Sequence, residues 1–380
     1  MRILYGVVGE GTGHATRSRV VIERLVARGH EVGVVASAKA EAYLGRFMAG
    51  SPARGRVEIV PIRGLSLRYG DEGIDRAATV AHNLAGAPDL VLRNAAAYFD
   101  LVGSFRPDLV FSDFDSFAYL FAKQTGVPVV SIDNIQMLAR CKQPDWVKKG
   151  AKVAFQLTKA FVKAKLPRCD RYVVTSFFFP PIKKKQARVT TLVPPILREA
   201  IVDAKATAEH GDHVLVYQTG HTSAALLDRL RRLTRERFVV YGGARRETLG
   251  NCEVMPFDEV GFVRDLAGAK AVVANGGFSL MSEAVYLGKP VYAVPVRHQF
   301  EQELNARWLQ GLGYGACARD WDGLEAFLDR RVYFTHNLRR HEQDGNEHLY
   351  DVLDEIVGGA AARRSTTRVK AVVSRSASAL

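Results

Sequence analysis

The 380-residue chain is poor in cysteine and has no long hydrophobic run. Both absences narrow the classes of protein to which it can belong. Its four cysteines (Cys141, Cys169, Cys252 and Cys317) are scattered, without a CxxC pair or a Cys/His ligand spacing. This favours reduced thiols in a cytoplasmic protein and no structural metal. No apolar stretch approaches the length of a membrane span. The opening residues, MRILYGVV, are expected to form a strand rather than a signal peptide.

Acidic residues are also scarce relative to basic ones, and the imbalance is regional. The chain has 53 Lys and Arg against 40 Asp and Glu, a net charge of +13. Residues 139–188 carry fourteen basic side chains and two acidic ones, and residues 359–380 carry five basic side chains and no acid. The net positive charge of these two segments together exceeds that of the whole chain. The excess of basic residues therefore needs an explanation that is specific to these segments.

Apolar, β-branched runs alternate with helical patterns along the whole chain. This alternation predicts an α/β fold with parallel, doubly wound sheets, and the length suits two domains. A helical pattern over 77–105 contains Pro88, which is expected to break it. The run Val193-Pro194-Pro195-Ile196 suits a stiff linker. The predicted division is 1–194, including the basic segment 139–188, then 195–323, then helices over 324–357 and a disordered basic tail over 358–380.

The most specific pattern lies between Asn275 and Gly315. A buried strand ends at Asn275-Gly276-Gly277, where glycine lets the backbone turn tightly and approach a ligand. The next helix begins with Ser279 and Glu283, and helix starts favour anions. Polar groups then follow the next strand, at the edge where open α/β sheets bind ligands; they are His298, Glu301, Gln302 and Asn305.

This ordered pattern resembles the donor-sugar motif of GT-B fold glycosyltransferases. The similarity is strongest to the superfamily of UDP-glycosyltransferases and the peptidoglycan lipid-intermediate N-acetylglucosaminyltransferase. It implies two Rossmann-like domains with a cleft between them and a hexosyltransferase that uses a UDP-sugar donor, without an obligatory cofactor or metal. It also implies that 195–323 binds the donor, that 1–194 binds the acceptor, and that 324–357 crosses back to the first domain.

The resemblance assigns donor roles by position. Glu283 resembles the residue that holds both ribose hydroxyls, and Glu301 with Gln302 resembles the pair that binds sugar hydroxyls. Asn305 is either a donor contact or a helix cap, and Phe262 either flanks the nucleotide base with Phe257 or belongs to the core. The remaining donor-side candidates are Gly220, His221, Thr222, Gly243, Asn275, Gly276, Gly277, Ser279 and His298.

The loop after the first strand contains a candidate base, His14. A dinucleotide pattern would need glycine at that place and an acid near Ala36-Ser37, so we disfavour it. In the family that the chain resembles, this loop faces the cleft, and a His in it is similar to the base of inverting transferases. Neutral imidazole suits that role. The alternative is that His14 merely lies near a helix start.

Carboxylates at neighbouring strand ends complete the candidate site. Asp113 and Asp115 follow a strand, and a similarly placed Asp in plant-type transferases forms a dyad with the His. The alternative is that both cap the next helix. The acceptor-side candidates are Gly11, Thr12, Gly13, Arg17, Asp133 and Asn134.

The basic segment contains a helical pattern over 146–164. Lys148, Lys152, Lys159 and Lys163 fall on one side, and Trp146, Val153, Leu157 and Phe161 fall on another. The apolar run 176–181 and three lysines at 183–185 follow. This composition is typical of an interfacial membrane helix. The alternative is a surface helix with solvated lysines, and we expect no nucleic-acid partner because no such motif accompanies the charge.

The predicted function is that of a cytoplasmic, inverting glycosyltransferase, peripheral on the inner leaflet of the plasma membrane. It moves a sugar from a UDP-sugar to an acceptor hydroxyl, and residues 146–188 meet an anionic membrane surface that supplies a lipid-linked or cell-envelope acceptor. The alternatives are an enzyme like the UDP-N-acetylglucosamine 2-epimerases, which share the fold, and a degenerate GT-B protein that only binds.

Overall fold

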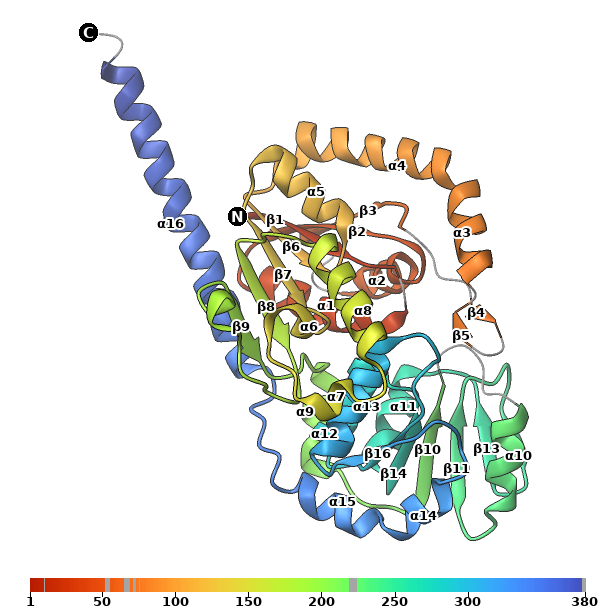
Figure 1. The fold of residues 1–380 in the computed structure, drawn as a ribbon. Helices are drawn as coiled ribbons and strands as arrows, with labels where there is room; N and C mark the ends of the chain where they lie inside the picture. The colour runs from red at the N-terminus through yellow and green to blue at the C-terminus, as the bar shows by residue number, and fades with distance from the viewer. Residues whose placement is uncertain are drawn as a thin grey trace.

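Two seven-stranded β-sheets, each with helices on both faces, form the two halves of the molecule (Figure 1). The computed structural model describes residues 1–9, 11–51, 55–64, 69–70, 73–74, 76–218 and 224–377. The arrangement confirms the predicted α/β fold with two doubly wound sheets. Most of the predicted apolar runs lie in the buried strands, because a parallel sheet covered on both faces needs apolar side chains on both.

The first sheet is parallel throughout and is built from the first half of the chain. Its strand order is β3-β2-β1-β6-β7-β8-β9. The strands are β1 Arg2–Val7, β2 Glu31–Ala36, β3 Val57–Pro61, β6 Leu109–Asp113, β7 Val129–Asp133, β8 Arg171–Thr175 and β9 Thr190–Val193. The order reverses beside β1, and this places the ends of β1 and β6 at the point where such sheets bind ligands.

The second sheet repeats this topology, with one antiparallel strand at its edge. Its order is β12-β13-β11-β10-β14-β15-β16. The strands are β10 His213–Tyr217, β11 Arg237–Tyr241, β12 Glu247–Leu249, β13 Cys252–Met255, β14 Ala271–Ala274, β15 Val291–Ala293 and β16 Gly315–Cys317. A separate hairpin pairs β4 Tyr69–Gly70 with β5 Gly73–Ile74.

Helices cover the two faces of the first sheet in separate layers. Ile3 and Tyr5 pack with α1 (Thr12–Ala27) and α2 (Ala38–Gly50), whereas Leu4 faces the other layer. That other layer contains α4 Ala87–Asp100, a π-helix Leu101–Phe105, α5 Ser116–Thr125, α6 Met137–Arg140 and α8 Lys152–Lys165. The remaining helices of this half are α3 Arg76–Ala85, α7 Asp145–Lys148 and a 3-10 turn, Lys184–Gln186.

The helices of the second half likewise cover the two faces of its sheet in separate layers. Those that line the side toward the first half are α11 Glu259–Ala267, α12 Phe278–Tyr286 and α13 Phe300–Gly311. Those on the other face are α10 Ala224–Arg232, α14 Leu324–Asp329 and α15 Arg331–Leu338. The linker leads into α9 Glu199–Ala204 and a 3-10 turn, Lys205–Thr207, and the described chain ends in α16 Glu347–Ala377.

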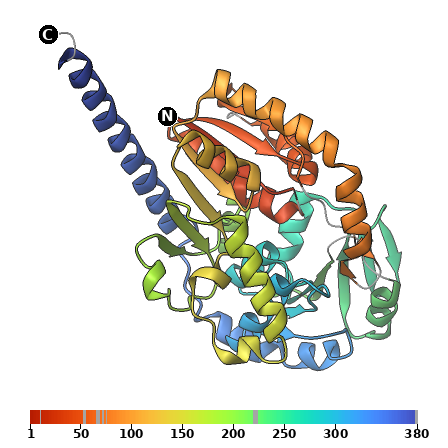
Figure 2. The same cartoon turned by 45° about the horizontal axis from the view of Figure 1, so that its top comes forward.

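The predicted break in the 77–105 helical pattern is present. Helix α3 ends at Ala85, and α4 starts at Ala87 with Pro88 in its first turn. Figure 2 shows the bend between these two helices in orange. Proline is tolerated there because a first-turn N–H has no partner within the helix.

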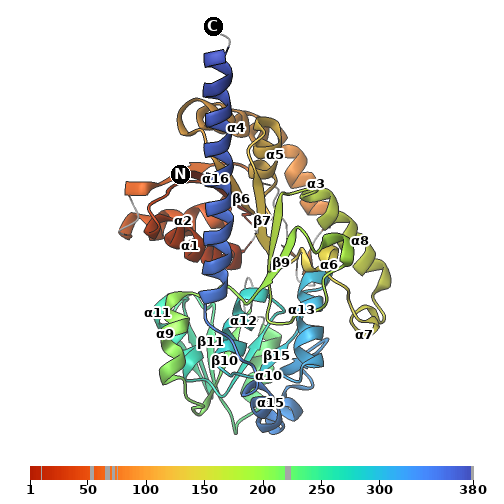
Figure 3. The ribbon, with the colours of Figure 1, turned by 90° about the vertical axis from the view of Figure 1, so that its left-hand side faces the viewer.

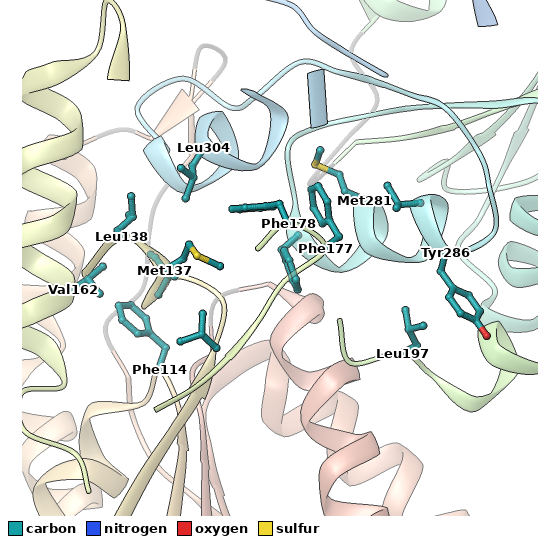
Figure 4. Close-up of a cluster of buried hydrophobic side chains, with 14 of the residues drawn as sticks. Phe114, Met137, Leu138, Val162, Phe177, Phe178, Leu197, Met281, Tyr286 and Leu304 are labelled. Carbon is teal, nitrogen blue, oxygen red and sulfur yellow. The ribbon is translucent and has the colours of Figure 1, made fainter. Parts of the chain in front are cut away.

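One hydrophobic cluster continues from the first half into the second. Phe177 and Phe178, which follow β8, are 1% and 2% exposed. Phe177 stacks on Phe278 of α12 with ring centroids 5.9 Å apart, and Phe178 stacks on Trp308 of α13 at 4.7 Å. Figure 4 shows both rings between side chains of the two halves. The halves are therefore held together by a shared core.

The last helix, α16, returns to the first half, as Figure 3 shows. Leu349, Leu353 and Val357 are buried in the cluster formed by α1 and the first sheet, and Asp354 pairs with Arg24 at 2.7 Å. We expected disorder from residue 358, but α16 continues to Ala377. Alanine and arginine, which are frequent there, are strong helix formers.

The basic segment differs from the single helix that was predicted. Gly150 adopts φ 74° and separates α7 from α8, because this left-handed conformation ends the first turn. Trp146 does not share a face with the apolar stripe of α8, since its ring packs against Trp308 with centroids 5.0 Å apart. No helix in the described parts of the chain is long and apolar enough to cross a membrane.

Candidate active site

Loops that follow strands of both sheets meet between the two halves. Ser279 Oγ, in the first turn of α12, donates to the carbonyl of Gly13 at 3.0 Å. Asn134 Nδ2 donates to Asn305 Oδ1 at 3.3 Å. A Cβ atom at Gly13 would lie 2.8 Å from Ser279 Oγ, so glycine permits this approach. Residues predicted on the acceptor side thus lie against residues predicted on the donor side.

The structure brings His14 and Asp113 together as a pair. His14 lies in the first turn of α1, and its Nδ1 is 2.8 Å from Asp113 Oδ1 at the end of β6. The His14 side chain is 18% exposed, whereas Asp113 is fully buried. Burial alone would raise the pKa of Asp113, but the charges and hydrogen bonds of Arg17 and His14 outweigh it and hold that pKa at about 2. Asp113 is therefore a carboxylate at neutral pH.

Arg17 was predicted on the acceptor side, but it belongs to the His14–Asp113 pair. Its Nε and Nη2 donate to the two oxygens of Asp113 at 2.8 and 2.6 Å, and Ser18 Oγ donates to the same carboxylate at 3.0 Å. Arg17 Nη2 also lies 2.7 Å from His14 Nδ1. Nδ1 cannot donate to Asp113 and accept from Arg17 at once. When it donates, Nε2 carries the lone pair that a base needs.

The other two buried carboxylates have local partners. Asp115 caps α5 by accepting from the Ala118 amide at 2.8 Å, which matches the alternative given for it. Asp133 accepts from Ser131 Oγ at 2.7 Å and from the Gln136 amide at 2.9 Å. Burial raises the pKa of each to about 6. Among these three carboxylates, Asp113 is the one that contacts His14.

On the donor side, two of the predicted donor residues, Gln302 and Asn305, hold the loop together. Gln302 Oε1 accepts from the amides of Gly276 and Val296 at 3.2 and 3.0 Å, and its Nε2 donates to Gln299 at 2.6 Å. Asn305 Nδ2 donates to the Gly276 carbonyl at 3.2 Å. A Cβ at Gly276 would lie 2.3 Å from the Gln302 carbonyl oxygen, so this position requires glycine.

Glu283, the predicted ribose residue, is engaged by Arg198 from the linker. Arg198 Nε and Nη2 donate to its two oxygens at 2.8 and 2.7 Å, and Arg198 Nη1 donates to Glu259 at 3.0 Å. Burial would lower the pKa of Arg198, but Glu283 and then Glu259 raise it. That Glu283 binds the ribose stays a prediction. The carboxylate that would do so is already paired with Arg198.

An aromatic group lies where the nucleotide base was predicted. Phe262 is buried and packs edge-on against Tyr241 and Tyr217 at 5.0 and 5.6 Å, consistent with a core role. Phe257 packs against the same group and is 55% exposed. Gly243 donates from its amide to the Met255 carbonyl at 3.0 Å nearby. Phe257 is thus the ring with a free face.

The remaining candidates lie around this loop. Glu301 is half-buried in the first turn of α13. Burial would lower the pKa of Arg17, but the charges of Asp113, Asp133 and then Glu301 raise it. His298 is exposed at φ 67°, which is rare for a residue with a Cβ. Asn275 donates to the Val294 carbonyl at 2.9 Å, and Gly277 precedes α12. Gly220, His221 and Thr222 lie outside the described residues.

Comparison with known proteins identifies the family to which this chain belongs. The family model described as glycosyl transferase family 1 matches residues 1–331. The chain belongs to that family. As a member of glycosyl transferase family 1, it is 23% identical over 344 residues to an uncharacterized glycosyltransferase of Methanosarcina mazei, covering 83% of this chain and 85% of the relative. It is 26% identical to one of Methanosarcina acetivorans, covering 96% and 95%.

Solved structures share the fold of this glycosyltransferase. The calicheamicin glycosyltransferase CalG4 matches with a TM-score of 0.62 at 17% identity, covering 94% of this chain and 98% of that protein. Phytolacca americana UGT2, complexed with UDP-2fluoro-glucose and pterostilbene, matches with a TM-score of 0.62 at 14% identity, covering 95% and 99%. The predicted GT-B fold is therefore confirmed.

Three residues that sequence reasoning missed hold the site of this glycosyltransferase in shape. Ser18 follows Arg17 in α1 and supplies a further hydrogen bond to Asp113. Arg198 and Glu259 form the ion pairs around Glu283. The sequence signal for Ser18 was its place in the first turns of a helix that follows a strand. The only sequence signal for Arg198 was that a basic residue follows the linker. Among the described residues no group of His, Cys, Asp and Glu could hold a metal ion.

Proposed function

We propose that this glycosyltransferase inverts the anomeric carbon as it moves a sugar from a UDP-sugar to an acceptor hydroxyl. The observation that carries the proposal is the His14–Asp113 pair, 2.8 Å apart, in which His14 directly follows Gly13, whose carbonyl accepts from Ser279 of the second half. A base next to the donor helix is what a single displacement needs. The first half supplies the base and acceptor site, and the second half supplies the donor site.

The proposed reaction is a single displacement. The acceptor oxygen forms a bond to the anomeric carbon while its proton moves to His14 Nε2. The bond between that carbon and the diphosphate oxygen breaks at the same time, and UDP leaves with the electron pair. Asp113, which Arg17 and Ser18 keep ionised and fixed, stabilises the imidazolium that forms.

The leaving diphosphate is proposed to meet the N-terminal end of α12. The first amides of a helix have no partner within it, and the helix dipole favours negative charge there. Gly277 precedes this helix, and Ser279 adds a hydroxyl. We propose that these groups stabilise the leaving diphosphate without an obligatory metal. Excess EDTA should therefore leave turnover unchanged.

The first experiment replaces the base. His14→Ala should lower turnover about 10²- to 10⁴-fold, while the affinity for UDP measured by calorimetry stays as in the wild type. His336→Ala, an exposed histidine on α15, is the matched control. Wild-type turnover in His14→Ala would remove His14 as the base. A screen of UDP-sugars by thermal shift selects the donor for this assay.

The same assay separates transfer from the other predicted activity of this fold. The enzyme is incubated with the donor alone, and the sugar is followed by NMR. We expect at most slow hydrolysis until an acceptor is added. An epimerised sugar nucleotide formed without an acceptor would identify an epimerase instead. Absence of UDP release with every acceptor tested would favour a protein that only binds.

We propose further that α8 brings the enzyme to an anionic, inner-leaflet membrane surface that carries a lipid-linked or cell-envelope acceptor. Val153, Leu157 and Phe161 form a stripe at successive i,i+4 positions and are 74%, 66% and 55% exposed. Lys152 and Lys163 are exposed beside it. On the same side of the sheet, α4 exposes further apolar side chains, namely Val91, Leu92 and Phe99. Exposed apolar area rimmed by lysines suits anionic lipid.

The membrane proposal is tested by vesicle sedimentation. Replacing Val153, Leu157 and Phe161 by Ser should abolish binding to phosphatidylserine vesicles without lowering the melting temperature. Replacing the exposed pair Val332 and Tyr333 of α15 by Ser is the control. Binding should weaken with salt because the lysines act through charge. Unchanged binding of the triple variant would contradict the proposal.

A further inference from the structure

The linker delivers a buried arginine to the donor half. Arg198 is 9% exposed, and its partner Glu283 is 7% exposed. Two parallel N–H···O bonds, 2.8 and 2.7 Å long, join its guanidinium to both oxygens of that carboxylate. This fork geometry fixes the plane of the carboxylate as well as its charge.

The pair lies on the side of α12 that faces the first half. Ser279 and Glu283 are four residues apart in this helix and therefore share a face. Ser279 reaches the Gly13 carbonyl of the first half at 3.0 Å, so Glu283 follows one turn further along the same side. The carboxylate that Arg198 holds is thus at the boundary between donor and acceptor halves.

Arg198 is itself held from several directions. Its Nη1 donates to Glu259 of α11 at 3.0 Å, and Glu259 lies 3.8 Å from Arg19 of α1. The preceding residue, Leu197, exchanges two backbone hydrogen bonds with the Asn346 side chain, at 2.9 and 2.8 Å. The guanidinium therefore has little freedom to leave Glu283.

We propose that Arg198 is the positioning residue for the donor's ribose, acting through Glu283. It holds the carboxylate in one orientation through two hydrogen bonds, and each oxygen keeps a second lone pair for a ribose hydroxyl. The role rests on the proposed function, in which Glu283 accepts from the ribose diol. Because Arg198 belongs to the linker, the ribose contact depends on a residue outside both sheets.

The test compares two nucleotides by calorimetry, UDP and 2′,3′-dideoxy-UDP, which lacks the diol. The wild type should bind UDP more tightly by about tenfold or more, the effect of hydrogen bonds to a charged group. In Arg198→Met this ratio should fall close to one. Arg198→Lys, which keeps the charge but not the fork, should give an intermediate ratio and guards against a Met variant that does not fold.

The ratio distinguishes positioning from general support of the fold. A purely structural arginine would, when replaced, weaken both nucleotides equally and leave the ratio at its wild-type value. That result would overturn the proposal. Arg19→Met is the matched control, because Arg19 pairs with Glu259 whereas Glu283 is paired with Arg198, and its ratio should stay as in the wild type.

Glu283→Gln separates failure of this inference from failure of the proposed function. If the Gln variant loses the preference for the diol and the Arg198 variants keep it, only the role of Arg198 is wrong. If the Gln variant keeps the preference, Glu283 does not bind the ribose, and the role of Arg198 falls with it. If wild-type protein binds neither nucleotide, the UDP donor itself is refuted.

Discussion

The two halves of the candidate site use polar side chains in different ways. In the first half, Arg17, Ser18 and His14 all converge on one buried carboxylate, Asp113. In the second half, Gln302, one of the two side chains that resembled sugar ligands, accepts hydrogen bonds from two backbone amides of the protein itself. The first side concentrates charge at one reactive group, whereas the second side uses amides to shape a loop.

This difference predicts that substitutions on the two sides impair different properties of the enzyme. Loss of a group around Asp113 should lower turnover while nucleotide affinity remains, because the donor loop is untouched. Loss of a loop-holding contact should weaken nucleotide binding first. Among the polar predicted donor residues that the structure describes, Glu301 and His298 have side chains without a hydrogen bond to the described chain, and they stay candidates for direct sugar contacts.

The largest expected effect follows from Asp113→Asn. The amide cannot stabilise an imidazolium as a carboxylate does, so turnover should fall roughly 10²- to 10⁴-fold. Arg17 would also lose its buried partner, which costs on the order of 3–5 kcal/mol of unfolding free energy. Steady-state rates, UDP calorimetry and urea unfolding measure the three quantities.

Asp170→Asn is the control for that change, because this carboxylate accepts from the Val129 amide away from the site. It should retain wild-type turnover. A substitution at Asp113 that weakened UDP binding as strongly as turnover would show that the two sides are not separate.

A smaller effect is expected from Gly276→Ala in the donor loop. The new Cβ would lie 2.3 Å from the Gln302 carbonyl oxygen, so the loop must shift. Overpacking of this kind costs about 1–3 kcal/mol, and UDP affinity should fall roughly tenfold to a hundredfold. Gly45→Ala in α2, away from the donor loop, is the control, since a Cβ there would meet no atom of the described residues within 4 Å. Equal affinities of the two variants would argue against a preformed donor loop.

The smallest effect concerns Asp133 and pH. Burial raises the pKa of Asp133 to about 6, above the value near 3.9 of an unfolded chain. The folded state then binds the proton more tightly, so the favourable contribution is present below about pH 4 and is lost as pH rises through 6. Asp113 behaves oppositely: its stabilising contribution is present above about pH 4 and is lost as pH falls through about 2.

Asp133→Asn should therefore make the fall in unfolding free energy between pH 4 and 6 shallower, by on the order of 1–2 kcal/mol. Urea unfolding across this range measures it, with Asp170→Asn as the exposed control. An unchanged slope would mean that Asp133 titrates as in the unfolded chain.

Sequence reasoning predicted the two sheets because their strands are apolar on both faces, which is a local property. It did not single out β8, where RYVVT begins and ends with polar residues. It also joined α7 and α8, because the apolar spacing continues across Gly150 while the backbone does not. Conformation at a single glycine is set by packing that periodicity does not report.

For the candidate site, residues at strand ends were predictable and their partners were not. His14 and Asp113 follow adjacent parallel strands, so their meeting follows from topology. Arg198 and Glu283 are 85 positions apart, and no pattern links a linker residue to a helix face. The same limit applies to Gln302, because no sequence pattern links its side-chain oxygen to the two backbone amides from which it accepts.

The chain crosses between the halves twice, once after β9 and once before α16, and Leu197 and Asn346 join the two crossings. Two connections joined side by side restrict relative motion of the halves more than a single linker would. Together with the stacked rings of the shared core, they keep His14 and the start of α12 in one relative position.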